Sequence, residues 1–175
     1  MDCAARTAYV AFGGNLGDPR ETLRTAIPLI EERIGRVELV SSLYETKALT
    51  MDGSIQPNYL NAVVSLSTVL EPSAILVALL EIERVLGRDR SPNKRWEPRV
   101  IDLDLLFVED VIESTALLTL PHPEIPNRDF VLEPLAEIAP NLIHPTLDRS
   151  IAGLLEDLSL RNRERFVLGK LVAAG

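Results

Sequence analysis

The chain has 175 residues, of which 46% are hydrophobic and 25% charged, and its formal net charge is −8. This length suits one domain with a substantial core rather than two domains. A composition close to the globular average argues against disorder and against fibrous repeats. The acidic balance argues against nucleic acid as a partner, because phosphate backbones attract basic surfaces.

The small numbers of cysteines and histidines and the hydropathy pattern argue against further classes of protein. The chain has one cysteine, Cys3, and two histidines, His122 and His144. We therefore expect neither a disulfide framework nor a metal site built from Cys or His. No apolar run approaches the roughly 18 residues that a membrane span needs, and the N-terminus lacks the pattern of a signal peptide. These features predict a cytoplasmic protein with no membrane partner.

The first half of the chain predicts a strand, a helix and two more strands. Residues 7–14 (TAYVAFGG) have strand composition, and residues 15–36 have the capping residues and periodicity of a helix that Pro28 is expected to kink or interrupt. Residues 37–46 and 58–69 predict the second and third strands. The loop between those strands is longer than a hairpin needs, and such loops often carry function.

The second half predicts a second helix over 71–88, a strand from 95 to about 108, and a short strand or hairpin arm after it. A proline-rich loop and two C-terminal helices follow, and nothing is predicted from Arg161 onward. The resulting order, βαββαβ, is that of the ferredoxin-like α+β sandwich, in which an antiparallel sheet carries helices on one face.

The strand RWEPRVIDLDLLF (95–107) contains two acidic residues within an apolar run. Asp102 and Asp104 are two residues apart, so their side chains share a face and their Cα atoms lie roughly 6.5–7 Å apart. Two such carboxylates repel each other unless a positive group lies nearby. They either form structural ion pairs with Arg95 or Arg99, or hold hard cations such as Mg²⁺ together with phosphate oxygens and water.

A cluster of basic residues precedes the acidic pair. Six of the 18 Lys and Arg residues lie between positions 84 and 99. Such a run is often only a solvated surface, but guanidinium groups also bind phosphate oxygens, and Trp96 could stack on a base or anchor the loop. The loop and the acidic pair together predict a site for Mg²⁺ and a nucleoside triphosphate.

Other candidate residues lie on the third strand and in the proline-rich loop. Tyr59 and Asn61 share a face of the strand, and the amide of Asn61 can read the edge of a heteroaromatic ring. In the loop, His122 is a candidate proton or phosphate contact, Arg128 a candidate anion contact and Phe130 a candidate stacking platform. Each of these residues also has an ordinary structural interpretation. The glycines of GGN (13–15) do not form a P-loop, because the G-x-x-x-x-G-K-[ST] pattern is absent.

Five motifs, in this order, resemble those of the 6-hydroxymethyl-7,8-dihydropterin pyrophosphokinase family, over about residues 8 to 160: FGGNLGD, YET, QPNYLNAV, RWEPRVIDLDLL and PHPxxPNRxFVLxPLxEIAP. The resemblance implies transfer of the pyrophosphoryl group of MgATP, which is a co-substrate, to the hydroxymethyl group of the pterin, with release of AMP, in folate biosynthesis. It implies in-line attack at the β-phosphorus without a covalent intermediate. It also implies one pyrophosphokinase domain over 1–160, an extension of unknown role over 161–175, and a monomer whose partners are small-molecule substrates.

The resemblance also assigns roles to residues. Asp102 and Asp104 would hold two Mg²⁺ ions. The residues that would bind the pterin are Thr46, Lys47, Ala48, Leu49, Tyr59, Asn61 and Phe130. Those that would bind ATP are Glu83, Arg90, Trp96, Arg99, His122 and Arg128. The catalytic set would be Arg88, Arg90, Arg99, His122 and Arg128.

Some residues depart from the family pattern. Glu97 stands where the family usually has glycine, Gly14 stands where it usually has serine, and Lys47 and Ala48 lie in a loop of different composition. Two other classes stay open: a ferredoxin-like binding or regulatory module that does not release AMP, and a different Mg²⁺-dependent phosphotransferase or nucleotide hydrolase. The identity of the product separates all three.

Overall fold

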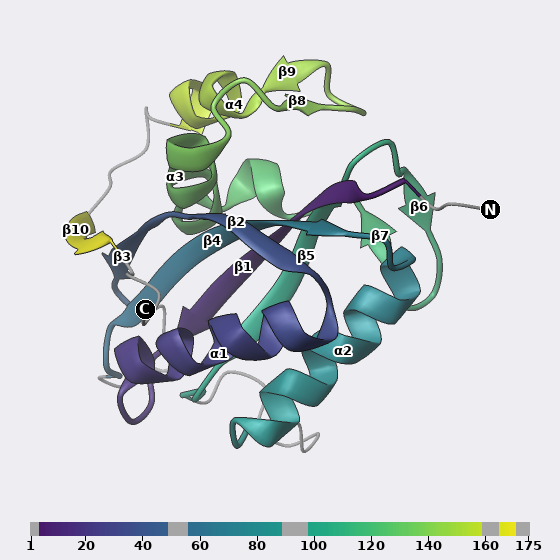
Figure 1. Cartoon of the computed structure of the whole chain (residues 1–175). Helices are drawn as coiled ribbons and strands as arrows, with labels where there is room; N and C mark the ends of the chain where they lie inside the picture. The colour runs from purple at the N-terminus through teal and green to yellow at the C-terminus, as the bar shows by residue number, and fades with distance from the viewer. Residues whose placement is uncertain (1–3, 49–55, 89–97, 159–164, 171–175) are drawn as a thin grey trace.

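An antiparallel sheet forms the centre of the fold (Figure 1). The computed structural model describes residues 4–48, 56–88 and 98–158, together with the backbone of 165–170. The strands run in the order β10-β3-β4-β1-β5, and β2 also pairs with β4. Their bounds are β1 (Arg6–Gly14), β2 (Arg36–Val40), β3 (Ser42–Thr46), β4 (Tyr59–Thr68), β5 (Asp102–Val108) and β10 (Arg165–Lys170).

Helices cover both faces of this sheet (Figure 1). On one face, α1 (Pro19–Arg33) and α2 (Pro72–Val85) pack on Val10 of β1 and Val64 of β4. On the other face, α3 (Asp129–Ile138) and α4 (Ile151–Leu158) pack on Ala11 and Val63. Adjacent residues of the central strands therefore enter different cores, which explains why β4 is apolar at consecutive positions.

The predicted βαββαβ order is confirmed apart from a break in its second strand, and the C-terminal helices are confirmed. Pro28 lies inside α1 and does not end it. The proline is exposed, while Ala26, Ile27 and Ile30 around it are buried against the sheet. Tertiary packing thus offsets the cost of the proline within the helix.

The predicted strand over 37–46 is instead two strands, β2 and β3, which break at Ser41. Ser41 is fully buried, and its Oγ accepts a hydrogen bond from Val63 N at 2.9 Å and donates one to Ser42 O at 2.8 Å. A serine hydroxyl that bonds to backbone groups competes with the regular ladder. Both β2 and β3 pair antiparallel with β4, so the chain continues along the same strand through the break.

Short elements complete the described chain. The predicted hairpin arm is present as β6 (Glu113–Ser114) and β7 (Thr119–Leu120). A second hairpin and a short 3-10 helix were not predicted; they are β8 (Ile143–His144) with β9 (Arg149–Ser150), and η1 (Ile125–Asn127). Strand β10, where no element was predicted, pairs with the edge of β3. Among the described residues no helix has the length and hydropathy to span a bilayer.

Candidate active site

The two aspartates lie at the start of β5, the edge strand next to β1. Their neighbours Leu103 and Leu105 are buried in the core beneath α1 and α2, so both carboxylates point to the opposite face. The side chains of Asp102 and Asp104 are 22% and 38% exposed. The prediction that they share one accessible face therefore holds.

Asp102 is enclosed by guanidinium groups. Its Oδ1 pairs with Arg88, and its Oδ2 with Arg99 at 2.5 Å. Burial by itself would raise the pKa of Asp102, but the charges of Arg88 and Arg99 outweigh it and hold the pKa below its ordinary value. Asp102 therefore forms the structural ion pair that was one of the two interpretations of the acidic pair. Arg99 is one of its two predicted partners, and the other, Arg95, lies outside the described residues.

Asp104 has a different environment. The ion pair to Arg128 is long, at 3.9 Å. Burial raises the pKa of Asp104, and the charge of Asp102 raises it further, while His122 and Arg128 oppose the shift. Burial in turn lowers the pKa of His122, although Asp104 acts in the other direction. The carboxylate of Asp104 is thus placed where an additional cation would stabilise its charged form.

Glu83 lies beneath this site rather than in it. The side chain is 1% exposed, and its carboxylate accepts hydrogen bonds from Leu103 N at 2.7 Å and from Arg88. It therefore links α2 to β5 and fixes the guanidinium group that binds Asp102. Its predicted contact with nucleotide stays a prediction.

The predicted ring-reading residues lie on the same face as the aspartates. In the sheet, Gly13 of β1 is opposite both Asn61 of β4 and Asp102 of β5. A Cβ atom on Gly13 would lie 3.4 Å from Asn61 Oδ1 and 3.9 Å from Asp102 Cβ. Because Gly13 has no side chain, the space above the sheet stays open between Asn61, the predicted pterin contact, and Asp102, the predicted metal ligand. A glycine within an apolar strand is the signal that could have revealed this role.

Asn61 and Thr46 lie on one side of the open space above Gly13. Asn61 is 5% exposed, and its Nδ2 donates to Thr46 Oγ1 at 2.9 Å. Tyr59, two residues before Asn61, points to the same face. Burial raises the pKa of Tyr59, with the charge of Arg99 opposing and that of Asp102 adding to the shift, so its hydroxyl lies near Arg99 and Asp102.

Phe130 lies in the first turn of α3, which packs on β3 and β4. The guanidinium carbon of Arg128 lies 5.8 Å from the centroid of its ring, a cation–π distance. Lys47 and Ala48 directly follow β3. The predicted site residues Leu49, Arg90 and Trp96, and the departure at Glu97, lie outside the described residues.

Asn15, in the GGN motif, was not predicted as a site residue. It is 3% exposed, its Nδ2 donates to Pro57 O at 3.0 Å, and its Oδ1 accepts from Arg99 N at 2.8 Å. The side chain therefore joins the segment before β4 to the segment before β5. Next to it, a Cβ atom on Gly14 would lie 2.7 Å from Val100 O, which shows how closely the end of β1 approaches that second segment.

We expect Asn15→Ala to lower the free energy of unfolding by about 1–3 kcal/mol, because it removes both hydrogen bonds of a buried side chain. Asn15→Asp keeps the acceptor for Arg99 N but loses the donor to Pro57 O. Urea unfolding followed by circular dichroism measures both variants. A stability of Asn15→Ala equal to wild type would show that the two hydrogen bonds contribute nothing.

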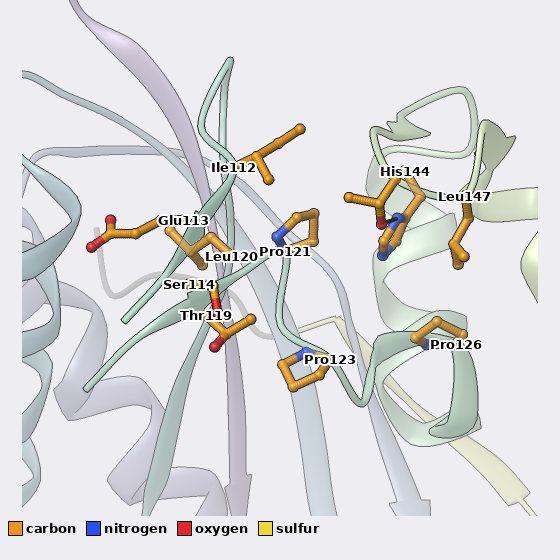
Figure 2. A pocket seen from close by; sticks show the side chains of 11 residues that line it. Ile112, Glu113, Ser114, Thr119, Leu120, Pro121, Pro123, Pro126, His144 and Leu147 are labelled. Atoms are coloured by element: carbon orange, nitrogen blue, oxygen red, sulfur yellow. Dashed lines mark hydrogen bonds between the residues drawn. The ribbon is translucent and has the colours of Figure 1, made fainter. Parts of the chain in front are cut away.

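A separate hollow of about 330 Å³ lies between the β6–β7 and β8–β9 hairpins (Figure 2). Prolines and aliphatic side chains form most of its lining, and His144 lies at one side. It contains none of the residues predicted for the active site. The imidazole of His144 packs edge-on against Phe107 at a centroid distance of 5.5 Å and bonds to Thr146 Oγ1.

Burial lowers the pKa of His144, so protonation favours the unfolded chain. The unfolded pKa is about 6.5, and stability is therefore expected to fall as the pH drops below about 6.5 towards the lower folded pKa. In His144→Gln, the part of the pH dependence of stability that is due to His144 should be lost. Urea unfolding of both proteins between pH 5 and 8 measures it, and a constant difference in unfolding free energy across that range would contradict the expectation.

The fold and the face of β5 and β4 together define a class of protein: a ferredoxin-like protein with an acidic pair, arginines that converge on it and a buried amide nearby, an arrangement suited to phosphoryl-group transfer from a nucleoside polyphosphate. Residues 9–140 match the family described as 7,8-dihydro-6-hydroxymethylpterin-pyrophosphokinase (HPPK). The chain belongs to this family.

Individual relatives agree with this assignment. A 2-amino-4-hydroxy-6-hydroxymethyldihydropteridine pyrophosphokinase of Synechocystis is 41% identical over 152 residues, which cover 86% of this chain and 75% of the relative. A pyrophosphokinase of the same name from Aquifex aeolicus is 39% identical over 139 residues, which cover 79% of this chain and 84% of the relative. The chain covers only 20% of the fission-yeast folic acid synthesis protein fol1, to which it is 37% identical.

Solved structures support the fold. The crystal structure of Plasmodium falciparum HPPK-DHPS with pteroate superposes with a TM-score of 0.72 at 16% identity, over 90% of this chain and 45% of that one. The chain thus spans less than half of this longer protein. At this identity, the likeness supports the architecture only.

Proposed function

We propose that this member of the pyrophosphokinase family transfers the pyrophosphoryl group of ATP to 6-hydroxymethyl-7,8-dihydropterin, releasing AMP and the pterin diphosphate. The observation that carries the proposal is the row Asn61–Gly13–Asp102 across three adjacent strands. In this row the amide that would read the pterin lies next to the carboxylate that would hold Mg²⁺ for the triphosphate. Family membership supports the same reaction in folate biosynthesis.

The acidic pair suits Mg²⁺. Carboxylate oxygens are the ligands that this hard cation prefers, and Asp104 lies where an added positive charge would offset burial and the charge of Asp102. The described residues contain no group of three or more Asp, Glu, His or Cys side chains that could hold a metal ion. Phosphate oxygens and water would complete the coordination, as is common for Mg²⁺. When bound, two Mg²⁺ ions held by Asp102 and Asp104 would neutralise charge on the triphosphate.

The arginines would act on the phosphates. Arg88 and Arg99 hold Asp102, and Arg128 lies near Asp104 with His122 beside it. A polyphosphate in this place offers the guanidinium groups a second set of oxygens, so Arg88 and Arg99 would shift from the carboxylate towards the phosphates. Together with Arg90 and Arg128 they would stabilise the charge that develops during in-line attack at the β-phosphorus. Trp96 would complete the proposed nucleotide side, and Glu83 would support it from beneath by fixing Arg88.

The pterin would lie over Gly13, with its ring between Tyr59 and Phe130. The amide of Asn61 would read the ring edge together with the segment Thr46, Lys47, Ala48 and Leu49. A side chain at position 13 would occupy this space. The binding of a flat heteroaromatic ring between two aromatic rings and beside an amide provides both stacking and a directional match.

Asn61→Ala is expected to weaken pterin affinity about tenfold, equivalent to about 1.4 kcal/mol, because it removes directional contacts with the ring. ATP affinity should change less than about twofold. Isothermal titration with each ligand measures both affinities. Asn58→Ala is the matched control, since Asn58 is exposed and lies just before the same strand. An equal loss of both affinities would contradict the assignment of Asn61 to the pterin.

The competing classes make different products. A binding module would hold nucleotide without forming AMP, and another phosphotransferase or hydrolase would form ADP or free pyrophosphate without needing Asn61. We further propose a cytoplasmic monomer and a domain ending near residue 160, which stay predictions from the sequence. Size-exclusion chromatography with light scattering tests the monomer.

A further inference from the structure

Glu137 belongs to the PLxEIAP motif and is not among the residues proposed to bind ATP, the pterin or Mg²⁺. It lies in the last turn of α3, and its carboxylate accepts three hydrogen bonds from β3. Ser42 N donates at 2.8 Å, Ser42 Oγ at 3.0 Å and the Tyr44 hydroxyl at 3.1 Å. One side chain thus fastens this helix to one strand.

These bonds lie at the start of β3. The ladder between β3 and β4 covers Tyr44 to Thr46, and Ser42 is outside it; on its other edge β3 pairs with β10, where Ser42 is opposite Lys170. The amide of Ser42 donates to Glu137, so α3 rather than β4 holds the start of β3. Glu137 thus fixes the start of the strand that ends at Thr46.

The strand and the helix that Glu137 joins carry the two sides of the proposed pterin site. Tyr44 is opposite Asn61 in the sheet, and Thr46 accepts the hydrogen bond of the Asn61 amide. Phe130 begins the same helix, seven residues before Glu137. Seven residues are about two helical turns, so Phe130 and Glu137 lie on the same side of α3, roughly 10.5 Å apart along its axis.

We propose that Glu137 is a positioning residue for the pterin site, which sets the position of Thr46 and Asn61 relative to Phe130. The proposal rests on the pterin site described under the proposed function. Glu137 acts through β3 and needs no contact with either substrate. Its loss is therefore expected to affect pterin binding more than ATP binding, since the acidic pair, Arg88 and Arg99 lie on β5 and the segments leading to it.

The test compares Glu137→Ala, Glu137→Gln and Tyr44→Phe with wild type. Glu137→Ala loses all three hydrogen bonds, and we expect the Kd and KM for the pterin to rise about tenfold, with the Kd for ATP and kcat within about twofold of wild type. In Glu137→Gln the amide oxygen can accept from Ser42 N and Tyr44 while the amide nitrogen donates to Ser42 Oγ, so this variant should restore affinity. Tyr44→Phe removes one bond and should give a smaller, equally selective loss.

The measurements are isothermal titrations with the pterin and with a nonhydrolysable ATP analogue, steady-state kinetics, and urea unfolding of each variant. Glu32→Ala, an exposed change on the opposite face of the sheet, is the control and should leave both affinities unchanged. Unchanged pterin affinity in Glu137→Ala, or an equal loss of pterin and ATP affinity, would overturn the proposal. If Glu137→Ala does not fold, Tyr44→Phe decides: a selective loss of pterin affinity supports the proposal, and its absence refutes it.

A failure of the proposed function gives a different result. If the wild-type protein forms no pterin-dependent AMP, the proposed function is wrong. If the wild type is active but Asn61→Ala binds the pterin normally, the assignment of this face to the pterin is wrong. If the wild type is active, Asn61→Ala binds the pterin weakly and Glu137→Ala binds it normally, only the role of Glu137 is wrong.

Discussion

Replacing Asp104 with asparagine is expected to lower pterin-dependent AMP formation by a factor on the order of 10³, because it removes a proposed metal ligand from the triphosphate site. Asp102→Asn should lower it to a similar extent. Steady-state formation of AMP at saturating ATP measures both. Asp110→Asn is the control, since Asp110 lies in an exposed turn with φ of 58°, a conformation that asparagine readily adopts.

Stability should separate the two variants. Asp104→Asn removes a carboxylate whose charge is disfavoured by burial and by Asp102, so the folded protein should be at least as stable as wild type. Asp102→Asn weakens two ion pairs and should be less stable. Activity in Asp104→Asn near the wild-type level would mean that this carboxylate holds no essential metal.

The largest expected loss of stability follows from Glu83→Ala. Glu83 is a buried carboxylate that bonds to Arg88 and to the backbone of Leu103. Its removal leaves a guanidinium group and an N–H group without this acceptor, and loss of one partner of a buried ion pair costs about 3–5 kcal/mol. Urea unfolding measures the loss.

Two further variants define the cause. Glu83→Gln keeps an acceptor oxygen without the charge, so it should be less destabilised than Glu83→Ala. Glu81→Ala lies on the exposed side of the same helix and should change stability by less than about 0.5 kcal/mol. A loss in Glu83→Ala no larger than that in Glu81→Ala would show that the buried network does not support β5.

Elements with a strong local pattern were predictable from the sequence. The periodicity of α2 and the strand pattern of residues 58–69 gave the correct element types and order. The break at Ser41 was not predictable, because it depends on a serine hydroxyl that meets Val63 from another strand. The two-residue strands β8 and β9 are too short to show periodicity, and β10 depends on pairing with a distant segment.

The candidate site likewise has features that the sequence predicts and features that depend on contacts between distant segments. The common face of Asp102 and Asp104, and that of Tyr59 and Asn61, followed from the two-residue period of a strand. The position of Gly13 between Asn61 and Asp102 required the register of β1 with both neighbours, which a single sequence does not contain. The hydrogen bonds of Asn15 likewise join segments more than forty residues away in the chain.

The central claim is that one face of the sheet brings a pterin and the triphosphate of ATP together for pyrophosphoryl transfer. The most direct measurement is to mix the purified protein with MgATP and 6-hydroxymethyl-7,8-dihydropterin and to follow AMP by chromatography, with a pterin-free control. We predict AMP formation that depends on the pterin and is stoichiometric with the pterin diphosphate. Nucleotide binding without AMP, or formation of ADP independent of the pterin, would contradict the account.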